Sequence, residues 1–506
     1  MKHIYIFLLF AVVATVPSCS NLEEDPIGLL APESFFRTPT DVETATLGAY
    51  AWLANESLYG RRLTLTLQLR GDMCDIGDRN TPGRRQNVND FEMGPDNGMT
   101  VEIWPTFYQL IGTTNAVIEG AQQLPDGPDA AAAYVAEARF LRAFSYYHLV
   151  RLFGEIPYID FFITDPASVG SIEKTSVDVV YENIIADLQA AKAGLPDAQP
   201  GGVRSRPTRG TAASYLASVY LTRGNWQEAY NEAKFVIDNR DAFGYRLMED
   251  YADLYKARTA DGLAEHIFAV DFLNNQSGPS GQNVDFLGPV TGIRAVTTPD
   301  APNGGWSVSV PSLKVYTTWD DRDYRKEVSF IDSAMVDGVW SGYEAFAPNH
   351  NSPRPHMSKF FEFCGDNRGD CGVSDNNYVA FRYAEVLLIA AEAGLEAGIA
   401  ESEVLGYLNE VRERARFGSD FPMDVAPGMA KDDLIDLILD DRRLELSFEF
   451  KRWYDIKRRQ LGTEVFTGDD SLEPHPNFDP NRDYLMPIPQ DELDRNANLG
   501  PQNPGY

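Results

Sequence analysis

Residues 209–239 read RGTAASYLASVYLTRGNWQEAYNEAKFVIDN, and this stretch indicates two short helices packed against each other. Small and apolar residues recur along it at helical spacing: Leu216, Ala217, Tyr220, Gly224, Trp226, Ala229 and Ala233. The small side chains let two antiparallel helices approach closely, and Gly224 permits the turn between them. A helix pair of this kind cannot bury its faces alone, so we expect further pairs to stack on it.

Helical patterns continue on both sides of this stretch. The spacing of apolar residues predicts helices over 99–122 and 129–153, and another from a cap at Ser176 to about residue 195. A looser helix-turn-helix pattern covers residues 383–416. The pair at 209–239 has the spacing of a tetratricopeptide helix pair, and the segment at 383–416 is a looser echo of it. We therefore expect a mostly α fold in which tetratricopeptide-like helix pairs form an α-α scaffold.

The character of the sequence changes between residues 261 and 363. Gly, Pro, Asn and Ser become frequent, an alternating run at 266–272 predicts a strand, and several aromatic residues lie in loop-like sequence. Long loops on a rigid frame are where binding sites usually lie. We expect this segment to form a loop-rich, partly β ligand-binding face. Helix is predicted again over 431–458, and an extended, Pro-rich tail after residue 474.

The composition indicates a globular protein and disfavours one class of ligand. The chain has 506 residues, is 43% hydrophobic and contains no long linker, so one large compact unit is expected. It has 44 Lys and Arg against 75 Asp and Glu, a net charge of -31. This charge repels phosphate backbones, so nucleic acid is not an expected partner.

The first nineteen residues predict where the protein is located. Lys2 and His3 precede an apolar run at residues 4–16, which has the length of a signal peptide and is too short to span a bilayer. The sequence Val-Pro-Ser before Cys19 resembles a lipobox, so we expect a signal peptide at 1–18 and a lipid on Cys19. The alternative is an ordinary signal peptide with an incidental cysteine.

Three other cysteines are present. Outside the cytoplasm, Cys364 and Cys371 could close a short loop with a disulfide, or they could remain free thiols. Cys74 would then be free or buried. With only six histidines in the chain, a zinc site is not expected.

Two carboxylates could suggest catalysis. Glu445 and Glu449 lie one helical turn apart, as the acid and nucleophile of a glycosidase could. However, Arg442, Arg443 and Arg452 are predicted on the same helix, and nearby cations lower carboxylate pKa values where acid catalysis needs a raised one. We interpret the pair as buried ion pairs. The acidic run at residues 320–323 is interpreted as a helix-exit turn. No phosphate-binding, His-Glu-x-x-His or Gly-x-Ser-x-Gly motif is present. Enzymatic activity, cofactors and metals are therefore not expected.

Ligand binding without catalysis needs aromatic platforms and a few polar partners. Flat sugar faces stack on Trp or Tyr, while hydroxyl groups form hydrogen bonds with Arg, Asn and Asp. The candidate platforms are Trp306, Trp340 and Tyr343. The candidate hydrogen-bonding partners, all from the loop at residues 75–90, are Arg84, Asn87, Asn89 and Asp90.

The C-terminal part carries a resemblance to a known family. Residues 438–458, ILDDRRLELSFEFKRWYDIKR, resemble the signature helix of the SusD/RagB family, and residues 485–490, LMPIPQ, resemble that family's tail. Shorter matches are FRYAEVLL at 381–388, NLGPQNPGY at 498–506, FLRAF at 140–144 and LFGEIP at 152–157.

The resemblance implies an organisation and a role. It implies one SusD-like domain over residues 19–506, with an N-terminal part at about 19–240 and a loop-rich and C-terminal part at about 260–506. It also implies a lipid-anchored outer-membrane protein facing the cell exterior, which captures oligo- or polysaccharide and delivers it to a SusC-like TonB-dependent transporter. The alternative within the family is a peptide-binding RagB-like subunit of a peptide importer.

Overall fold

The computed structural model describes residues 35–256, 259–272, 277–278, 281–282, 285–294, 305–336, 338–346, 353–360 and 376–506. Cys19, Cys364 and Cys371 lie outside these ranges, so the lipid anchor and the disulfide stay predictions. Cys74 is a buried free thiol. Among the described residues, no helix is both long and apolar enough to cross a bilayer.

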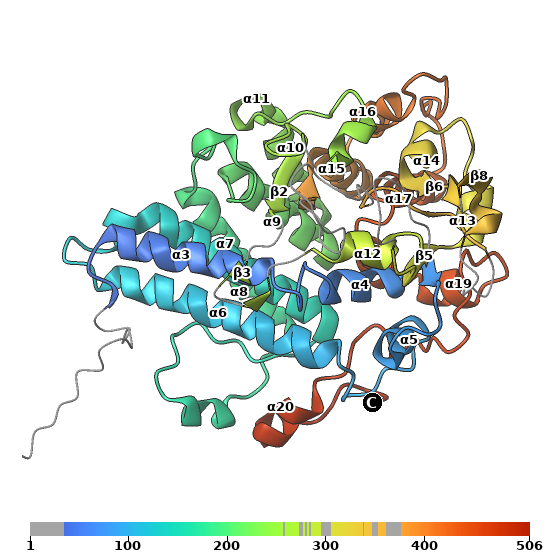
Figure 1. Ribbon diagram of the computed structural model, residues 1–506. Helices are drawn as coiled ribbons and strands as arrows, with labels where there is room; N and C mark the ends of the chain where they lie inside the picture. The colour runs from blue at the N-terminus through green and yellow to red at the C-terminus, as the bar shows by residue number, and fades with distance from the viewer. Residues whose placement is uncertain are drawn as a thin grey trace, which may run out of the picture.

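The long helices form a row in which each helix packs on the next (Figure 1). In order of contact they are α3 (Pro39–Leu53), α6 (Thr100–Gln122), α7 (Ala132–Phe153), α8 (Val177–Gly194), α9 (Arg209–Arg223), α10 (Trp226–Asp238), α15 (Tyr383–Ala397) and α16 (Glu401–Ala415), with α17 (Lys431–Glu445) against α15. α10 and α15 contact each other directly, although residues 239–382 separate them in the sequence. The helices predicted over 99–122, 129–153 and 176–195 and the pairs over 209–239 and 383–416 are thus confirmed.

Glycines end the first helix of each predicted pair. Gly224 after α9 has φ 72° and Gly398 after α15 has φ 78°, both in the left-handed region that a side chain disfavours. At each position the backbone N–H donates to carbonyls of the last turn, which satisfies groups that the helix end would otherwise leave unpaired. Gly224 therefore makes the turn that the sequence pattern predicts.

Shorter helices connect and flank the row. They are α4 (Arg62–Leu69), α5 (Gly83–Asn89), α11 (Arg240–Phe243), α12 (Leu287–Thr291), α13 (Leu313–Thr318), α14 (Tyr324–Ser329), α18 (Arg452–Arg458), α19 (Gly462–Thr467) and α20 (Gln490–Arg495). The tail that was predicted to be extended therefore contains the short helix α20. Its Pro-rich composition did not indicate this helix.

The continuous helix predicted over 431–458 is wrong. α17 ends at Glu445 and α18 begins at Arg452. Between them Phe448 and Phe450 have φ 64° and 62°, which no helix tolerates. Both rings are buried, and the Phe450 ring lies 5.2 Å from that of Tyr378. Burial of these two side chains offsets the unfavourable backbone, so tertiary packing breaks the helix.

The strands are short and paired two by two in the described residues. The antiparallel pairs are β1 (Cys74–Ile76) with β5 (Ser309–Pro311), β2 (His266–Val270) with β10 (Tyr378–Arg382), β3 (Ser277–Gly278) with β4 (Gly281–Gln282), β6 (Phe330–Ile331) with β9 (His356–Met357), and β7 (Ser333–Val336) with β8 (Val339–Gly342). The first pair matters most for function, because it brings the 75–90 loop beside the residues preceding β5.

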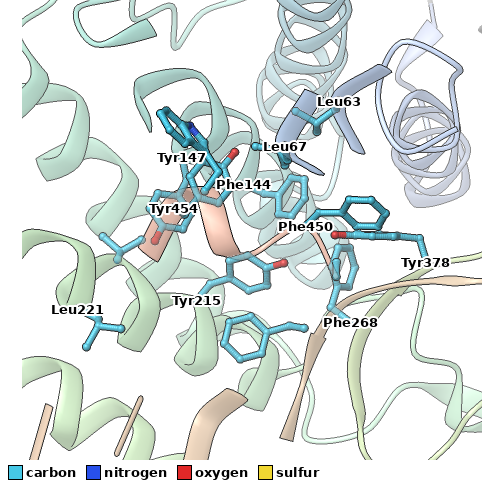
Figure 2. Close-up of a cluster of buried hydrophobic side chains, with 14 of the residues drawn as sticks. Leu63, Leu67, Phe144, Tyr147, Tyr215, Leu221, Phe268, Tyr378, Phe450 and Tyr454 are labelled. Atoms are coloured by element: carbon cyan, nitrogen blue, oxygen red, sulfur yellow. The ribbon is translucent and has the colours of Figure 1, made fainter. Parts of the chain in front are cut away.

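One large apolar core joins the helical row to the loop-rich segment. Figure 2 shows buried aromatic side chains meeting from separate elements: Phe144, Tyr215, Phe268, Tyr378, Phe450 and Tyr454. The Phe144 ring lies 5.8 Å from that of Phe268, so α7 and β2 contact through aromatic rings. Burying each such side chain contributes about 1.5–3 kcal/mol, which makes the frame beneath the loops rigid.

Candidate functional site

The polar loop at residues 75–90 is held by its own charged groups. Arg79 donates to Asp90 at 2.6 Å and to Asp75 at 3.3 Å. Asn89 is fully buried, and its Nδ2 donates to Asp75 at 3.0 Å and to Asp90 at 2.9 Å. The half-buried Asn87 donates to the Glu92 carbonyl at 3.2 Å. Asn87, Asn89 and Asp90 therefore support the shape of this loop, and Asn89 has no surface open to solvent.

Trp306 lies beside this loop with its ring partly open to solvent. Its neighbour Ser307 accepts, through its carbonyl, a hydrogen bond of 2.8 Å from the N–H of Asp78. The Trp306 N–H donates to the Pro289 carbonyl at 2.6 Å, so the backbone on both sides is fixed. The indole is 36% exposed and packs against Phe286, with ring centroids 5.9 Å apart. A partly exposed ring that is supported by another ring is suited to stacking on a sugar.

Four arginines lie close together, and one of them, Arg61, contacts Phe286. The Arg61 guanidinium lies 4.8 Å from the centre of the Phe286 ring, and Arg61 and Arg62 both pair with Glu56. Gly98 links them to the 75–90 loop, because its carbonyl accepts from Arg62 at 3.5 Å and the Arg84 side chain packs against its backbone. Arg85, the fourth, is next to Arg84 in α5. Arg61 joins this group to the Trp306–Phe286 pair.

Sequence reasoning found only part of this group. It named Arg84 and Trp306 but not Arg61, Arg62 or Phe286. The Arg61-Arg62 doublet is the same signal as the Arg84-Arg85 doublet, so a search for repeated arginine pairs would have found it. Phe286 carried no such signal, since its place beside Trp306 depends on a long-range fold contact.

Trp340 and Tyr343 lie on the β7–β8 hairpin and just after it. Trp340 is 68% exposed and stands opposite Met335 in the strand pair. Tyr343 is half-buried, packs against the cluster around Ile293, and has its ring edge-on to Tyr316 at 5.6 Å. Trp340 thus offers a free indole, whereas the Tyr343 ring is partly covered by the scaffold.

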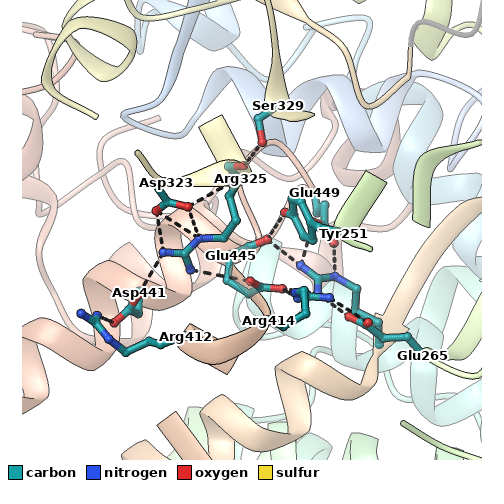
Figure 3. Close-up of polar contacts among 12 residues, drawn as sticks. Tyr251, Glu265, Asp323, Arg325, Ser329, Arg412, Arg414, Asp441, Glu445 and Glu449 are labelled. Carbon is teal, nitrogen blue, oxygen red and sulfur yellow. Dashed lines mark hydrogen bonds and ion pairs between the residues drawn. The ribbon is translucent and has the colours of Figure 1, made fainter. Parts of the chain in front are cut away.

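Glu445 and Glu449 lie in a buried ion-pair network, as expected, but with other partners (Figure 3). Glu445 accepts from Arg382 at 2.5 Å and from Arg414, and lies 3.6 Å from Arg325. Glu449 accepts from Lys359 at 3.0 Å and from Arg382 at 2.8 Å. These four cations come from four separate parts of the chain.

The predicted partners on the same helix are wrong. Arg442 pairs with Glu385 and Asp455, Arg443 with Asp440, and Arg452 with Asp72. Arg442 and Arg443 lie in α17 with Glu445 but pair with other carboxylates, and the break after α17 takes Arg452 off that helix, so helical spacing did not give the partners.

The electrostatics of the pair oppose acid catalysis. Burial raises the pKa of Glu445, but the charges of Arg414, Arg382 and Arg325 outweigh it and lower that pKa to about 2. The pKa of Glu449 is also lowered, because Arg382 and Lys359 outweigh the effect of burial. A glycosidase acid needs the opposite shift. The two carboxylates are therefore built to stay ionised and hold the fold together.

The acidic run at residues 320–323 is likewise engaged within the protein. Asp320 pairs with Arg322 at 2.8 Å, and Asp323 caps α14 and pairs with Arg325 at 2.7 Å. Within the described ranges, no group of three or more His, Cys, Asp or Glu is placed to hold a metal ion.

A groove runs along α6. Its volume is about 630 Å³, and its lining is mostly apolar, with Trp104, Tyr108, Phe161 and Phe162 among the contributing residues. The polar Asn115 in it is already bonded to the Ile159 and Phe161 carbonyls. Such a lining offers few partners for sugar hydroxyl groups, so we place the candidate site at Trp306.

Comparisons with known proteins agree with this architecture. Residues 309–506 match a family model described as "SusD family", and residues 23–221 match one described as "Starch-binding associating with outer membrane". A SusD-like protein, P2, of Formosa agariphila is 49% identical over 511 residues, covering 99% of both chains. The chain belongs to the SusD family.

Solved structures share the fold of this SusD-family protein. A SusD homologue from Bacteroides thetaiotaomicron is 21% identical, with a TM-score of 0.81, covering 94% of this chain and 98% of that one. A laminarin-binding SusD-like protein is 25% identical, with a TM-score of 0.80, covering 93% of this chain and 100% of that one. The mostly α fold and the family resemblance predicted from the sequence are confirmed.

Proposed function

We propose that this SusD-family protein is a cell-surface lipoprotein that binds oligo- or polysaccharide and passes it to a SusC-like TonB-dependent transporter. The sugar stacks on Trp306, with Trp340 as a second contact and Arg84 as a hydrogen-bonding partner. The observation that carries the proposal is the Trp306 side chain, which packs against Phe286 and remains partly exposed to solvent.

Several observations support binding in preference to catalysis. The site combines an aromatic platform with nearby hydrogen-bond donors, as sugar sites do. The carboxylate pair Glu445 and Glu449 is fully engaged in ion pairs away from solvent. A SusD-like protein with the same fold is described as laminarin-binding. Capture without cleavage is the function that fits these features together.

The membrane part of the proposal rests on the N-terminal sequence and the family. A lipid on Cys19 would tether the domain to the outer membrane, in keeping with the family description of outer-membrane association. A tethered binder cannot move its ligand across the membrane, so an adjacent transporter is required. Labelling with a radioactive fatty acid tests the anchor: wild type should incorporate label and Cys19→Ala should not. Gentle detergent extraction should recover the protein together with a SusC-like transporter.

Glycan binding is tested by affinity electrophoresis against a panel of soluble polysaccharides. Migration of the wild type should be retarded by at least one of them, and Trp306→Ala should abolish the retardation. Phe161→Ala is the matched control, because Phe161 is an exposed aromatic residue on the groove along α6. It should migrate like wild type in every gel.

The panel also separates the alternatives. Retardation without release of reducing ends supports capture, while release of product would favour a hydrolase. If no polysaccharide retards the protein and a peptide mixture binds instead, the RagB-like peptide role replaces the glycan role. Equal loss of binding in Trp306→Ala and Phe161→Ala would show that the site is not at Trp306.

A further inference from the structure

The basic group beside Trp306 contains cations without acidic partners. Arg85 is only 6% exposed, and its Nη1 donates to the hydroxyl of Thr81 at 3.0 Å. Within the described part of the chain, neither Arg84 nor Arg85 forms an ion pair. Burial, together with the charges of Arg61 and Arg84, lowers the pKa of Arg85 to about 10. The fold therefore keeps a buried cation among like charges.

The neighbouring Arg79 makes the contrast plain. It lies in the same loop and is neutralised by Asp75 and Asp90. The chain has 75 acidic residues and a net charge of -31, so carboxylates to pair with Arg84 and Arg85 are not scarce. A buried charge without a partner is costly, and such charges normally pair with an opposite charge. The missing partner at this site is an anion.

The same group is continuous with the proposed sugar platform. Arg61 covers the Phe286 ring, on which Trp306 packs, and the Phe286 N–H donates to the Gly60 carbonyl at 2.9 Å. Arg84 reaches this region across Gly98, which also accepts from Arg62. Glu56 and Glu102 pair with Arg61 and Arg62, and within the described residues no carboxylate lies within ion-pair distance of Arg84 or Arg85.

We propose that the glycan bound at Trp306 is anionic and that Arg84 pairs with its carboxylate or sulfate groups, with the buried Arg85 adding positive charge behind it. This inference rests on the proposed glycan-binding function and names the class of sugar. The planar guanidinium forms paired hydrogen bonds with either anion, and these charge-assisted bonds are stronger than those to neutral hydroxyl groups. The large negative charge of the whole chain repels polyanions at long range. Binding of an acidic sugar therefore depends on a local basic group, and this group supplies that selectivity at this face.

Isothermal titration calorimetry with matched probes tests the charge requirement. The probes are oligogalacturonate and its methyl ester, κ-carrageenan oligosaccharide and its desulfated form, and uncharged laminarihexaose. We expect one acidic probe to bind roughly tenfold more tightly than its neutral match, because a hydrogen bond to a charged group exceeds a neutral one by about that factor. Raising the salt from about 50 mM to about 500 mM should remove most of the difference by screening.

Variants assign the preference to the arginines. Arg84→Gln and the double variant Arg84→Gln with Arg85→Gln should lose the preference for the acidic probe while keeping weak binding through Trp306. Arg322→Gln is the control, since Arg322 is an exposed arginine elsewhere on the surface. Because no carboxylate depends on Arg85, Arg85→Gln should not lower the melting temperature. Replacing an arginine with a purely structural role would lower it.

The outcomes separate the two levels of the proposal. Tighter binding of one acidic probe that disappears in the double variant supports the inference, and the probe that wins distinguishes carboxylate from sulfate. Binding of laminarihexaose alone, or equal binding of charged and neutral partners, overturns the anionic class while leaving glycan binding intact. Failure of every probe overturns both. Preference that survives in the double variant also overturns the assignment.

Discussion

Replacing Glu445 by glutamine should destabilise the protein without affecting sugar binding. Glu445 is fully buried and lies within ion-pair distance of Arg382, Arg414 and Arg325 (Figure 3). Glutamine keeps the size of the side chain but not its charge, so three buried cations lose a shared anion. Breaking a buried pair by removing one partner costs about 3–5 kcal/mol, mainly because the remaining charge stays desolvated.

The expected shift in melting temperature follows from the size of the protein. Unfolding entropy is about 2.1 cal/mol/K per residue. The mature chain predicted over residues 19–506 has roughly 490 residues, so its unfolding entropy is about 1 kcal/mol per kelvin if it melts in one transition. The melting temperature of Glu445→Gln should therefore fall by about 3–5 °C at pH 7, measured by differential scanning calorimetry. Asp440→Asn is the control, because Asp440 forms an exposed pair with Arg443 on the same helix. Its melting temperature should change by less than about 1 °C, since surface pairs contribute up to about 1 kcal/mol.

Two results would refute this reasoning. A change in Glu445→Gln no larger than in Asp440→Asn would mean that the neighbouring carboxylates compensate for the loss. A glycan-cleaving activity in wild type that disappears in Glu445→Gln would return these carboxylates to a catalytic role. Unchanged sugar affinity in the destabilised variant is the result that the structure predicts.

Three further predictions concern the frame. The pKa values of Glu445 and Asp455 are both lowered to about 2, because nearby arginines outweigh burial. The stabilisation from these carboxylates is present above their unfolded-state pKa values of 4.5 and 3.8 and is lost as the pH falls toward 2. The melting temperature should therefore drop between about pH 5 and pH 2, and less steeply in Glu445→Gln. Gly398→Ala places a side chain at φ 78° and should cost about 1–2 kcal/mol in denaturant unfolding, whereas Gly406→Ala, in an open position within α16, should be neutral or stabilising. Trp340→Ala should leave the melting temperature unchanged, because its ring is exposed; a drop as large as a buried tryptophan would give contradicts its placement.

The helical frame was predictable because its signals are local. The small residues of the 209–239 pair and the glycines at 224 and 398 specify close packing and a turn through their own geometry. By contrast, the break after Glu445 depends on Phe448 and Phe450 being drawn into a core made by residues far along the chain. Nothing in the spacing of residues 431–458 signals that event.

The candidate site divides in the same way. An exposed tryptophan in loop-like sequence was predictable at position 306. Its backing by Phe286 and Arg61 was not, because these residues meet through the β1–β5 pair and the loop contacts around it. The polar residues predicted nearby, Asn89 and Asp90, are the ones that the fold uses to brace the loop. Residue type alone does not separate a brace from a ligand contact.

The direct packing of α10 on α15 has a consequence for how such proteins diversify. Because the helical row is complete without residues 239–382, that segment behaves as a cassette inserted between two neighbours that already fit each other. Its sequence can change length and chemistry while the helices keep their contacts, provided that its root keeps the ion pairs between Glu265 and Arg382 and between Lys359 and Glu449. Exchanging the cassette between relatives would therefore have to keep its core side chains such as Phe268, and transplanting ligand preference would also require Arg61 and the Arg84-Arg85 doublet outside it.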